Sequence, residues 1–591
     1  MNKKKMPSWA RLVAVLACCA AVGGAVHAQT YRPASVKEAV APLLTDEWEQ
    51  YAPYYRRCPV TADGDTCCVG CVALAMGEVM RYYEWPAQGT GQYSYTDLEG
   101  CGQELTADFS AHTYDWANML DDYYGTFCDE EADAVALLLG DCGVGVNMQY
   151  GVSSSGARSI YQPQALHAYF GYDEGMQYLY RNFFPQQEWD SILFTELSEG
   201  RPLLLSAYSM SLAHAMVCDG YDEEGYFHVV WGNEAGDANG YYYMNYLTPD
   251  QPTWYDKDSP EGGLNLLQSI VRGVEPEAGG TARHFYGFSH IDCVGEEADT
   301  VRVEVACLCN VGWQLHEGRV ALALKGINDP DTTLADSTRI VYTYARQFAL
   351  EEVDDTVYTD TISLARADIA AQGRLVPVFE QDGTFIEART MVGTPNYLVT
   401  DEEGGLEAPT EGLANLVVSN VNFPDSVEVN TKPEFAFTVT NTGDEYSGRI
   451  YIALTRSSDP TANIWGELGL SLSGGESVDL SFVRTRVTNV SSGLASLRIM
   501  ADMDLFTDSL NVLYEGERNI TVLPSGYYTG ISDPVISTDS STPEQGVYDL
   551  SGRRMRDDAP LPPGIYIVGG RKVLVRAGSG VTGSPDAADN R

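Results

Sequence analysis

The chain has 591 residues, which at about 150 residues per domain predicts roughly four domains. The 37 Lys and Arg against 83 Asp and Glu give a formal net charge of −46, and so acidic a surface disfavours nucleic acid and anionic lipid as partners. Only 20% of the residues are charged while 44% are hydrophobic, which indicates folded, filled cores and excludes a disordered polyanion.

The N-terminus has the pattern of a cleaved signal peptide over residues 1–28. Lys3, Lys4 and Lys5 precede an apolar run over residues 12–26, and small residues end at Ala28. Lipoprotein processing at Cys18 or Cys19 is the alternative. No later stretch is apolar for long enough to span a membrane. The sequence therefore predicts a protein that is secreted or held at a bacterial cell surface.

The cysteine count indicates a free thiol. Two of the 13 cysteines lie in the predicted signal peptide, which leaves 13 − 2 = 11 in the exported chain. An odd number cannot all form disulfides within one chain. At least one thiol must therefore be free, blocked or bonded to another chain.

Within residues 29–275, Cys71 is predicted to begin a helix. The apolar positions that follow it share one helical face, which ends at Pro86 and comprises Val72, Ala75, Met76, Val79 and Tyr83. The N-terminal end of a helix lowers the pKa of a thiol and makes it a nucleophile. The cluster with Cys58, Cys67 and Cys68 leaves open a disulfide knot or a metal site. We expect no cofactor and no bound metal.

A hairpin about 140 residues downstream supplies a candidate base. Strands over 213–219 and 226–231 flank a turn at 222–225, and a register that pairs residue i with 447 − i puts His214 opposite Asn233 and Met216 opposite Trp231. His214 then acts as general base, with Asn233 as its orienting group and Trp231 as a shield against water. A core histidine without catalytic role is the structural alternative, and His228 near the turn is a weaker candidate base.

Several motifs occur in one order along residues 41–275. They are Pro42-Leu43-Leu44 with Trp48, Pro53-Tyr54-Tyr55, Cys58-Pro59, Gly70-Cys71-Val72-Ala73, Trp85-Pro86, Tyr114-Asp115-Trp116, Gly145-Val146-Asn147-Met148-Gln149-Tyr150-Gly151, His214-Ala215-Met216, Asp219-Gly220, His228-Val229, Trp231-Gly232 and Asn239-Gly240-Tyr241. In this order they resemble the streptopain family of papain-clan cysteine peptidases. The resemblance implies a papain-like α+β domain, Cys71 as nucleophile, His214 as base, and protein or peptide substrates.

Two positions depart from the family pattern. Asp65 stands where the family has its oxyanion-hole glutamine, six residues before the nucleophile, and a carboxylate there would repel the developing oxyanion. After the base, the family has Asn-Trp-Gly-Trp, where this chain has Val230 and Asn233 around Trp231. The role given to Asn233 therefore comes from the predicted register and not from the family.

After the breaker cluster at 276–280 the sequence turns to short alternating strands. Residues 281–400 and 410–525 are predicted to form two immunoglobulin-like β-sandwiches, separated by a break at 401–405. Residues 526–545 are predicted to be a linker. The three strand patterns of residues 546–591 resemble the C-terminal sorting domains of type IX secretion cargo, which implies the bacterial secretion machinery as a partner.

These patterns together predict a secreted cysteine endopeptidase that acts through a thioester and a Cys71–His214 dyad. Asp65 and Val230 motivate one alternative, an inactive or weakened papain-like protein on the same fold. The other alternative is an adhesin that binds its ligand through the β-sandwiches.

Overall fold

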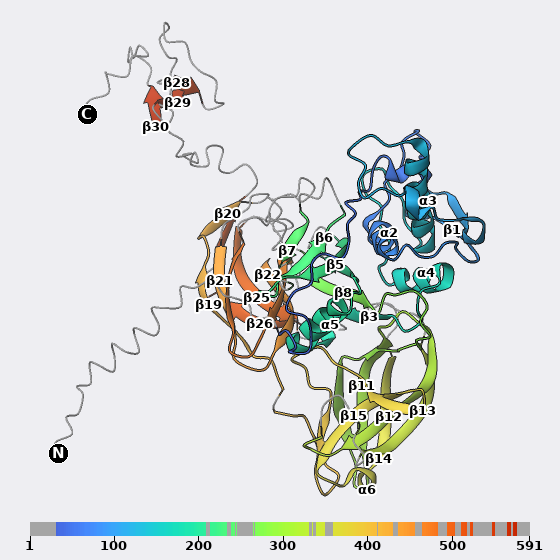
Figure 1. Cartoon of the computed structure of the whole chain (residues 1–591). Helices are drawn as coiled ribbons and strands as arrows, with labels where there is room; N and C mark the ends of the chain where they lie inside the picture. Colours follow the sequence, from blue (N-terminus) through green and yellow to red (C-terminus); the bar gives the residue numbers. More distant parts are fainter. Residues whose placement is uncertain are drawn as a thin grey trace, which may run out of the picture. The chain divides into compact units, whose positions relative to one another are not determined.

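The structure is a computed structural model of the chain, and its parts are described separately (Figure 1). The described residues are 31–208, 213–232, 238–242, 244, 247, 264, 266–329, 334, 338–348, 358–410, 412–428, 435–455, 464–482, 493–502, 510–516, 520–523, 547–549, 564–568 and 571–575. The chain divides into two compact units, Met1–Val522 and Leu523–Arg591. The predicted signal peptide and the predicted linker lie outside the described residues.

The helical half of the peptidase-like region surrounds one central helix. Its elements are η1 (Tyr54–Arg57), α2 (Cys71–Tyr83), β1 (Gln92–Thr96), β2 (Glu104–Asp108), η2 (Phe109–Ala111), η3 (Trp116–Asn118), α3 (Asp129–Gly145) and α4 (Tyr161–Phe170). The predicted helix at Cys71 is confirmed. Gly70 precedes it at φ +89°, and a Cβ there would lie 2.6 Å from the Met148 sulfur, so only glycine fits at this entry to α2.

A six-stranded antiparallel sheet forms the other half, in the order β3-β8-β4-β5-β6-β7. Its strands are β3 (Gln177–Tyr180), β4 (Leu203–Tyr208), β5 (Ala213–Tyr221), β6 (Phe227–Val230), β7 (Gly240–Tyr242) and β8 (Leu266–Arg272), and η4 (Arg181–Phe183) and α5 (Gln186–Ser198) lie between β3 and β4. Within the described residues, no helix is long and apolar enough to cross a bilayer.

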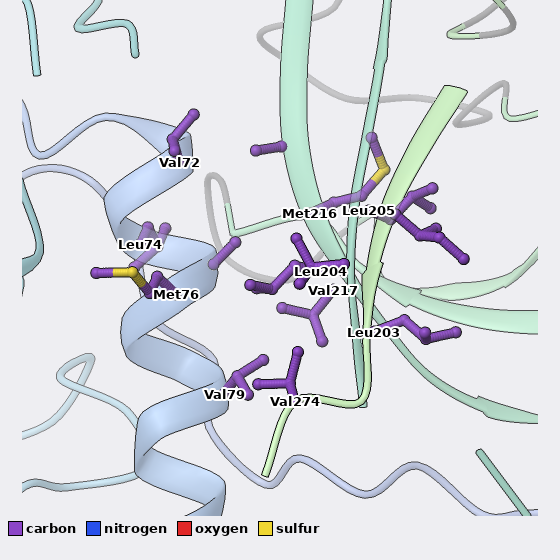
Figure 2. Close-up of a cluster of buried hydrophobic side chains, with 14 of the residues drawn as sticks. Val72, Leu74, Met76, Val79, Leu203, Leu204, Leu205, Met216, Val217 and Val274 are labelled. Carbon is purple, nitrogen blue, oxygen red and sulfur yellow. The ribbon is translucent and has the colours of Figure 1, made fainter. Parts of the chain in front are cut away.

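Apolar side chains join α2 to this sheet. Figure 2 shows Val79 of α2 meeting Val274, while Leu204 and Val217 point from the strands toward the helix. All four side chains are at most 1% exposed. Burial of this kind contributes about 25 cal/mol per Å² of apolar surface. The packing therefore fixes α2 against strands β4 and β5.

The predicted register of the β5–β6 hairpin is confirmed in its middle and wrong near its turn. Val217 pairs with Val230 and Cys218 with Val229, as i and 447 − i require, but beyond an irregularity Gly220 pairs with His228. One extra residue in β5 causes this shift, as in a β-bulge. The strand β6 ends at Val230, so Trp231 leaves the ladder before it can pair with Met216.

The described part of the region after residue 280 consists mainly of strands, as predicted, with one short helix. Its first part has β9 (Tyr286–Gly287), β10 (His290–Glu296), β11 (Thr300–Asn310), β12 (His316–Lys325), β13 (Arg339–Phe348), β14 (Tyr358–Ala365), α6 (Arg366–Ile369), β15 (Gly373–Gln381), β16 (Thr384–Glu387), β17 (Leu398–Thr400) and β18 (Leu406–Glu407). A four-stranded sheet around β11 and a six-stranded sheet around β12 and β15 share one apolar core. We call this part the first β region.

The turn at 401–405 lies inside the first β region. Val399 of β17 pairs with Glu407 of β18 across this turn, and Asp401 accepts hydrogen bonds from the backbone of Glu403 and Gly405 at 2.8 Å. The predicted break is therefore a hairpin turn, and the first set of strands continues to Glu407.

The second β region begins at β19 and also has two sheets around one core. Its strands are β19 (Leu416–Asn422), β20 (Ser426–Glu428), β21 (Phe435–Asn441), β22 (Tyr446–Thr455), β23 (Ile464–Leu472), β24 (Ser477–Phe482), β25 (Gly493–Asp502), β26 (Leu510–Glu515) and β27 (Ile520–Leu523). In the second unit, β28 (Val547–Asp549), β29 (Gly564–Val568) and β30 (Arg571–Val575) form the three-stranded antiparallel sheet that the sequence predicts.

Candidate active site

Cys71 is the first residue of α2 and is partly exposed. The first N–H groups of a helix have no intrahelical acceptor and favour a negative charge at this position. Burial by itself raises the pKa of the thiol, but the charge of His214 and its hydrogen bond to the sulfur outweigh burial, and the N–H groups of Ala215 and Val72 act in the same direction. The pKa of Cys71 is therefore lowered from its ordinary value.

His214 lies on β5, opposite Ala207 of β4, and only 6% of it is exposed. Its Nε2 is 2.7 Å from the carbonyl oxygen of Trp231. A carbonyl oxygen only accepts, so Nε2 carries the proton and Nδ1 is left to face the thiol. Burial favours the neutral ring, but the charge and hydrogen bond of Cys71 outweigh it and raise the pKa of His214.

Trp231 holds His214 from two sides. Its carbonyl accepts the Nε2 proton, and its indole lies almost parallel to the imidazole, at 14° with the ring centroids 6.0 Å apart. The backbone N–H of Trp231 in turn donates to Asn239 Oδ1 at 2.8 Å. Gly232 follows at φ +62°, where a Cβ would meet Leu74 at 2.7 Å. The group that orients His214 is thus a backbone carbonyl, and the predicted orienting residue Asn233 lies outside the described residues.

Asp65 is not where its spacing from Cys71 predicts. It is exposed and belongs to a small turn in which Thr61 N donates to Asp65 O at 2.9 Å and Asp65 N donates to Thr61 Oγ1 at 3.2 Å. The expected repulsion of an oxyanion by this carboxylate has no basis in this geometry. Counting six residues back fails because Asp65 closes the turn that begins at Thr61, and its side chain is exposed there.

Gln50 is a side-chain amide near the dyad that the spacing did not reveal. The backbone carbonyl of Gln50 accepts a hydrogen bond from Val69 N, two residues before Cys71, at 3.0 Å. Its Nε2 reaches 3.5 Å from the carbonyl of Gly232, next to Trp231. The residue is 9% exposed. Gln50 therefore lies between the segment that carries the thiol and the segment that orients the histidine.

The surroundings of the other cysteines and histidines indicate structural roles. Like Cys71, eight of these cysteines are free thiols: Cys58, Cys67, Cys68, Cys101, Cys128, Cys142, Cys218 and Cys293. His228 Nδ1 donates to the buried Asp219 Oδ1 at 2.6 Å, and His112 Nδ1 to Asp141 Oδ2 at 2.8 Å. Across the part of the chain that the structure describes, no three His, Cys, Asp or Glu side chains are grouped so that they could hold a metal ion.

Residues 48–242 match the sequence model of the peptidase C10 family. Residues 48–242 are a cysteine-peptidase region of this family. The match contains the helix of Cys71 and the hairpin of His214, so it agrees with the expected streptopain resemblance. Nothing in it concerns the C-terminal module or its predicted resemblance to sorting domains.

Individual proteins give the same result over the same part of the chain. The thiol protease/hemagglutinin PrtT of Porphyromonas gingivalis is 34% identical over 241 residues, which are 41% of this chain and 27% of PrtT. Streptopain of Streptococcus pyogenes is 31% identical over 261 residues, 41% of this chain and 65% of streptopain. The chain thus spans less than two thirds of the length of either relative.

One solved structure matches the same region. Active wild-type interpain A, a cysteine protease of Prevotella intermedia, is 36% identical with a TM-score of 0.37, over 41% of this chain and 97% of that chain. The matching family model is that of a peptidase family, and PrtT is named as a thiol protease. The enzyme class expected for the region, a cysteine-type peptidase, agrees with these sequence comparisons.

Proposed function

We propose that this protein is a cysteine endopeptidase that hydrolyses peptide bonds through the dyad Cys71 and His214. The observation that carries the proposal is the geometry of the pair: Cys71 begins helix α2, and His214, whose Nε2 is 2.7 Å from the Trp231 carbonyl, faces the thiol. In agreement with this geometry, the pKa of Cys71 is lowered and the pKa of His214 is raised. Such shifts favour a thiolate–imidazolium pair, which is the reactive form of a cysteine peptidase.

The arrangement supports acyl transfer in two steps. The thiolate of Cys71 attacks the peptide carbonyl, and His214 gives its Nδ1 proton to the leaving amine. A thioester remains on Cys71. His214 then takes a proton from water, the resulting hydroxide attacks the thioester, and the acid product leaves as Cys71 recovers the thiolate. The Trp231 carbonyl keeps Nε2 protonated throughout, so Nδ1 alone exchanges protons.

We propose that Gln50 stabilises the oxyanion together with the backbone N–H of Cys71. The N–H of a first helical residue has no acceptor within the helix. The backbone carbonyl of Gln50 accepts Val69 N, which holds the residue beside the segment of Cys71, and the long 3.5 Å contact of its Nε2 to the Gly232 carbonyl leaves Nε2 available for a stronger acceptor. Donors of this kind typically contribute about 10²–10³ in rate.

We further propose that the enzyme is exported and that residues 546–591 address it to a bacterial secretion machinery. The charge pattern of residues 1–28 and the three short strands of the second unit support this. Mass spectrometry of protein recovered outside the cells tests both points. An N-terminus at Gln29 is expected, as is loss of export when residues 546–591 are deleted; a retained leader or unchanged export contradicts the corresponding point.

A thiol trap tests the proposed activity. An epoxysuccinyl reagent should modify Cys71 in the full chain and abolish cleavage of casein or a fluorogenic peptide. The Cys71→Ala variant should neither react at that position nor cleave. Cys128→Ala is the matched control, because Cys128 is exposed and has no histidine partner in the described structure. Absence of a Cys71 adduct under reducing conditions would overturn the proposal.

A further inference from the structure

The segment 155–170, which ends in α4, touches both sides of the dyad. Gln162 of α4 is 1% exposed, and its Nε2 donates to the carbonyl of Val72, in the first turn of α2, at 3.0 Å. Ser159 Oγ lies 2.6 Å from Ser206 Oγ on β4, the strand that pairs with His214. This segment therefore ties the helix of the nucleophile to the sheet of the base.

The outer side of α4 is covered by Trp313 from the first β region. Trp313 lies in the turn between β11 and β12 and is 5% exposed. Gln164 Nε2 donates to the carbonyl of Trp313 at 3.3 Å, and the rings of Trp313 and His167 have centroids 5.9 Å apart. The indole N–H donates to Met176 O at 2.7 Å, just before β3. Three independent contacts thus fix Trp313 against the peptidase region.

The turn that carries Trp313 is itself rigidly held. Asn310 is fully buried; its Oδ1 accepts Gly312 N at 2.9 Å, and its Nδ2 donates to Gln314 O at 2.6 Å. Five residues of the first β region belong to the same hydrophobic cluster as the peptidase side chains: Phe285, Cys309, Val311, Trp313 and Met391. The two regions therefore share one core, which is how parts of a single domain pack, and independent modules do not.

We propose that the first β region is part of the catalytic unit and that Trp313 is a positioning residue for the dyad. Trp313 fixes the outer side of α4, and α4 sets the distance between the first turn of α2 and strand β4. Cys71 lies on α2, and His214 lies on β5, which pairs with β4 at Ala207, so their ion pair depends on α4 remaining in place. The inference rests on the proposed peptidase function for its kinetic consequence.

Trp313→Ala, Trp313→Phe and Leu322→Ala in the full chain test this role. Leu322 is the matched control: it is 1% exposed in the core of the first β region and belongs to a different cluster from Trp313. For each variant we would measure kcat and KM on a fluorogenic peptide, the pH dependence of Cys71 alkylation, hydrogen exchange of the α4 amides, and the melting temperature.

With Trp313→Ala we expect kcat to fall by about tenfold or more, because small misplacements of catalytic groups have large kinetic effects. The pH midpoint of Cys71 alkylation should rise toward that of an ordinary thiol, and the α4 amides should exchange faster. Trp313→Phe keeps the ring contact and should retain most of kcat. Leu322→Ala should lower the melting temperature without changing kcat or the alkylation midpoint.

Two results would overturn the inference. One is a Trp313→Ala variant that melts earlier but keeps the wild-type kcat and alkylation midpoint; the other is a Leu322→Ala variant that loses kcat equally. If Trp313→Ala does not fold, Trp313→Leu, which removes the ring contact to His167 but keeps an apolar side chain, takes its place with the same expected loss of kcat and the same faster exchange of α4. A wild-type chain without activity would contradict the proposed function alone, since alkylation and exchange would still report on the position of α4.

Discussion

The two ends of the β5–β6 hairpin each hold a histidine, and the two histidines have opposite surroundings. His228, near the turn, donates to the fully buried carboxylate of Asp219. His214, at the other end, donates to a backbone carbonyl through Nε2 and faces a thiol through its other nitrogen. By its carboxylate partner alone, His228 would be the stronger candidate for catalysis.

The difference shows that the neighbouring element decides the chemistry. The His214 end of β5 packs near the N-terminus of α2, where a thiol is stabilised as the thiolate. The His228 end instead anchors the N-terminal segment of the domain, because Asp219 also accepts the backbone N–H of Leu44 at 3.0 Å. One pair is reactive and the other joins two segments, although both lie on one hairpin.

The most direct test of this difference between His214 and His228 is to replace each histidine in turn. His214→Ala should lower kcat on the order of 10⁶-fold, as removal of one member of a nucleophile–base unit does in hydrolases. His228→Ala should keep kcat within a few fold, because its partner Asp219 does not touch the thiol. Steady-state kinetics on a peptide substrate measure both. Equal losses for the two variants would mean that the dyad has been assigned to the wrong end of the hairpin.

The next largest predicted loss of kcat concerns the stabilisation of the oxyanion. Gln50→Ala should lower kcat by about 10²–10³ with little change in KM, because the amide contacts the substrate oxygen only as charge develops. Asp65→Gln is the matched variant, since it puts an amide at the position that spacing alone favours. We expect no change from it, because Asp65 is exposed in its own turn. A gain of orders of magnitude would restore Asp65 as the residue that limits activity.

The helix of Cys71 and the contact of Gln50 show what can and what cannot be predicted from residues that are neighbours in the sequence. The helix at Cys71 and the hairpin of His214 follow from periodicity and turn residues, which act over a few neighbours. The bond between Gln50 and Val69 joins segments that are distant in sequence, and no fixed spacing encodes it. The insertion of Trp313 into the peptidase core is likewise a contact of distant segments. Such contacts depend on the whole fold.

The register of the β5–β6 hairpin shows the same limit of prediction from sequence, over a shorter separation along the chain. Counting from the turn predicts the pairs Val217–Val230 and Cys218–Val229, but one extra residue shifts the pairing near Gly220. An irregularity of this kind depends on packing, here on the backbone of Val40, Ala41 and Pro42 that lies against Gly220. The sequence could therefore bring His214 near Trp231 without predicting that the carbonyl of Trp231 would be its partner.

A third prediction concerns the buried carboxyl group of Asp46. Asp46 is 3% exposed, and burial raises its pKa from 3.8 to about 8. A hydrogen bond from its own backbone and the positive charge of Arg81 lower the pKa, while the negative charges of Asp121 and Asp219 raise it. Between these two values Asp46 holds its proton in the folded protein and loses it in the unfolded chain. The contribution of Asp46 to stability must therefore fall as the pH rises from about 4 to about 8.

Asp46→Asn should flatten this dependence. We would measure urea unfolding of the variant between pH 4 and 8 in a Cys71→Ala background, where the dyad cannot titrate as a pair. Asp63→Asn is the control, because Asp63 is an exposed turn residue. A pH dependence that survives in Asp46→Asn would mean that Asp46 does not hold a proton in the folded state; Glu78, whose pKa burial also raises, would then be the group to replace.

The smallest predicted effect concerns the pair of His228 and Asp219, to which we assign a structural role. His228→Gln removes the partner of a fully buried carboxylate, and we expect a loss of about 1–3 kcal/mol in the free energy of unfolding, because Asp219 keeps its bond to Leu44. His290→Gln is the matched control: His290 Nε2 lies 3.6 Å from the exposed Asp292, and such a surface pair contributes about 1 kcal/mol or less. Urea unfolding would measure both. Equal losses would mean that the His228–Asp219 pair contributes no more than a surface contact, so that the N-terminal segment must be anchored by the backbone bonds of Val40 and Leu43 to β5.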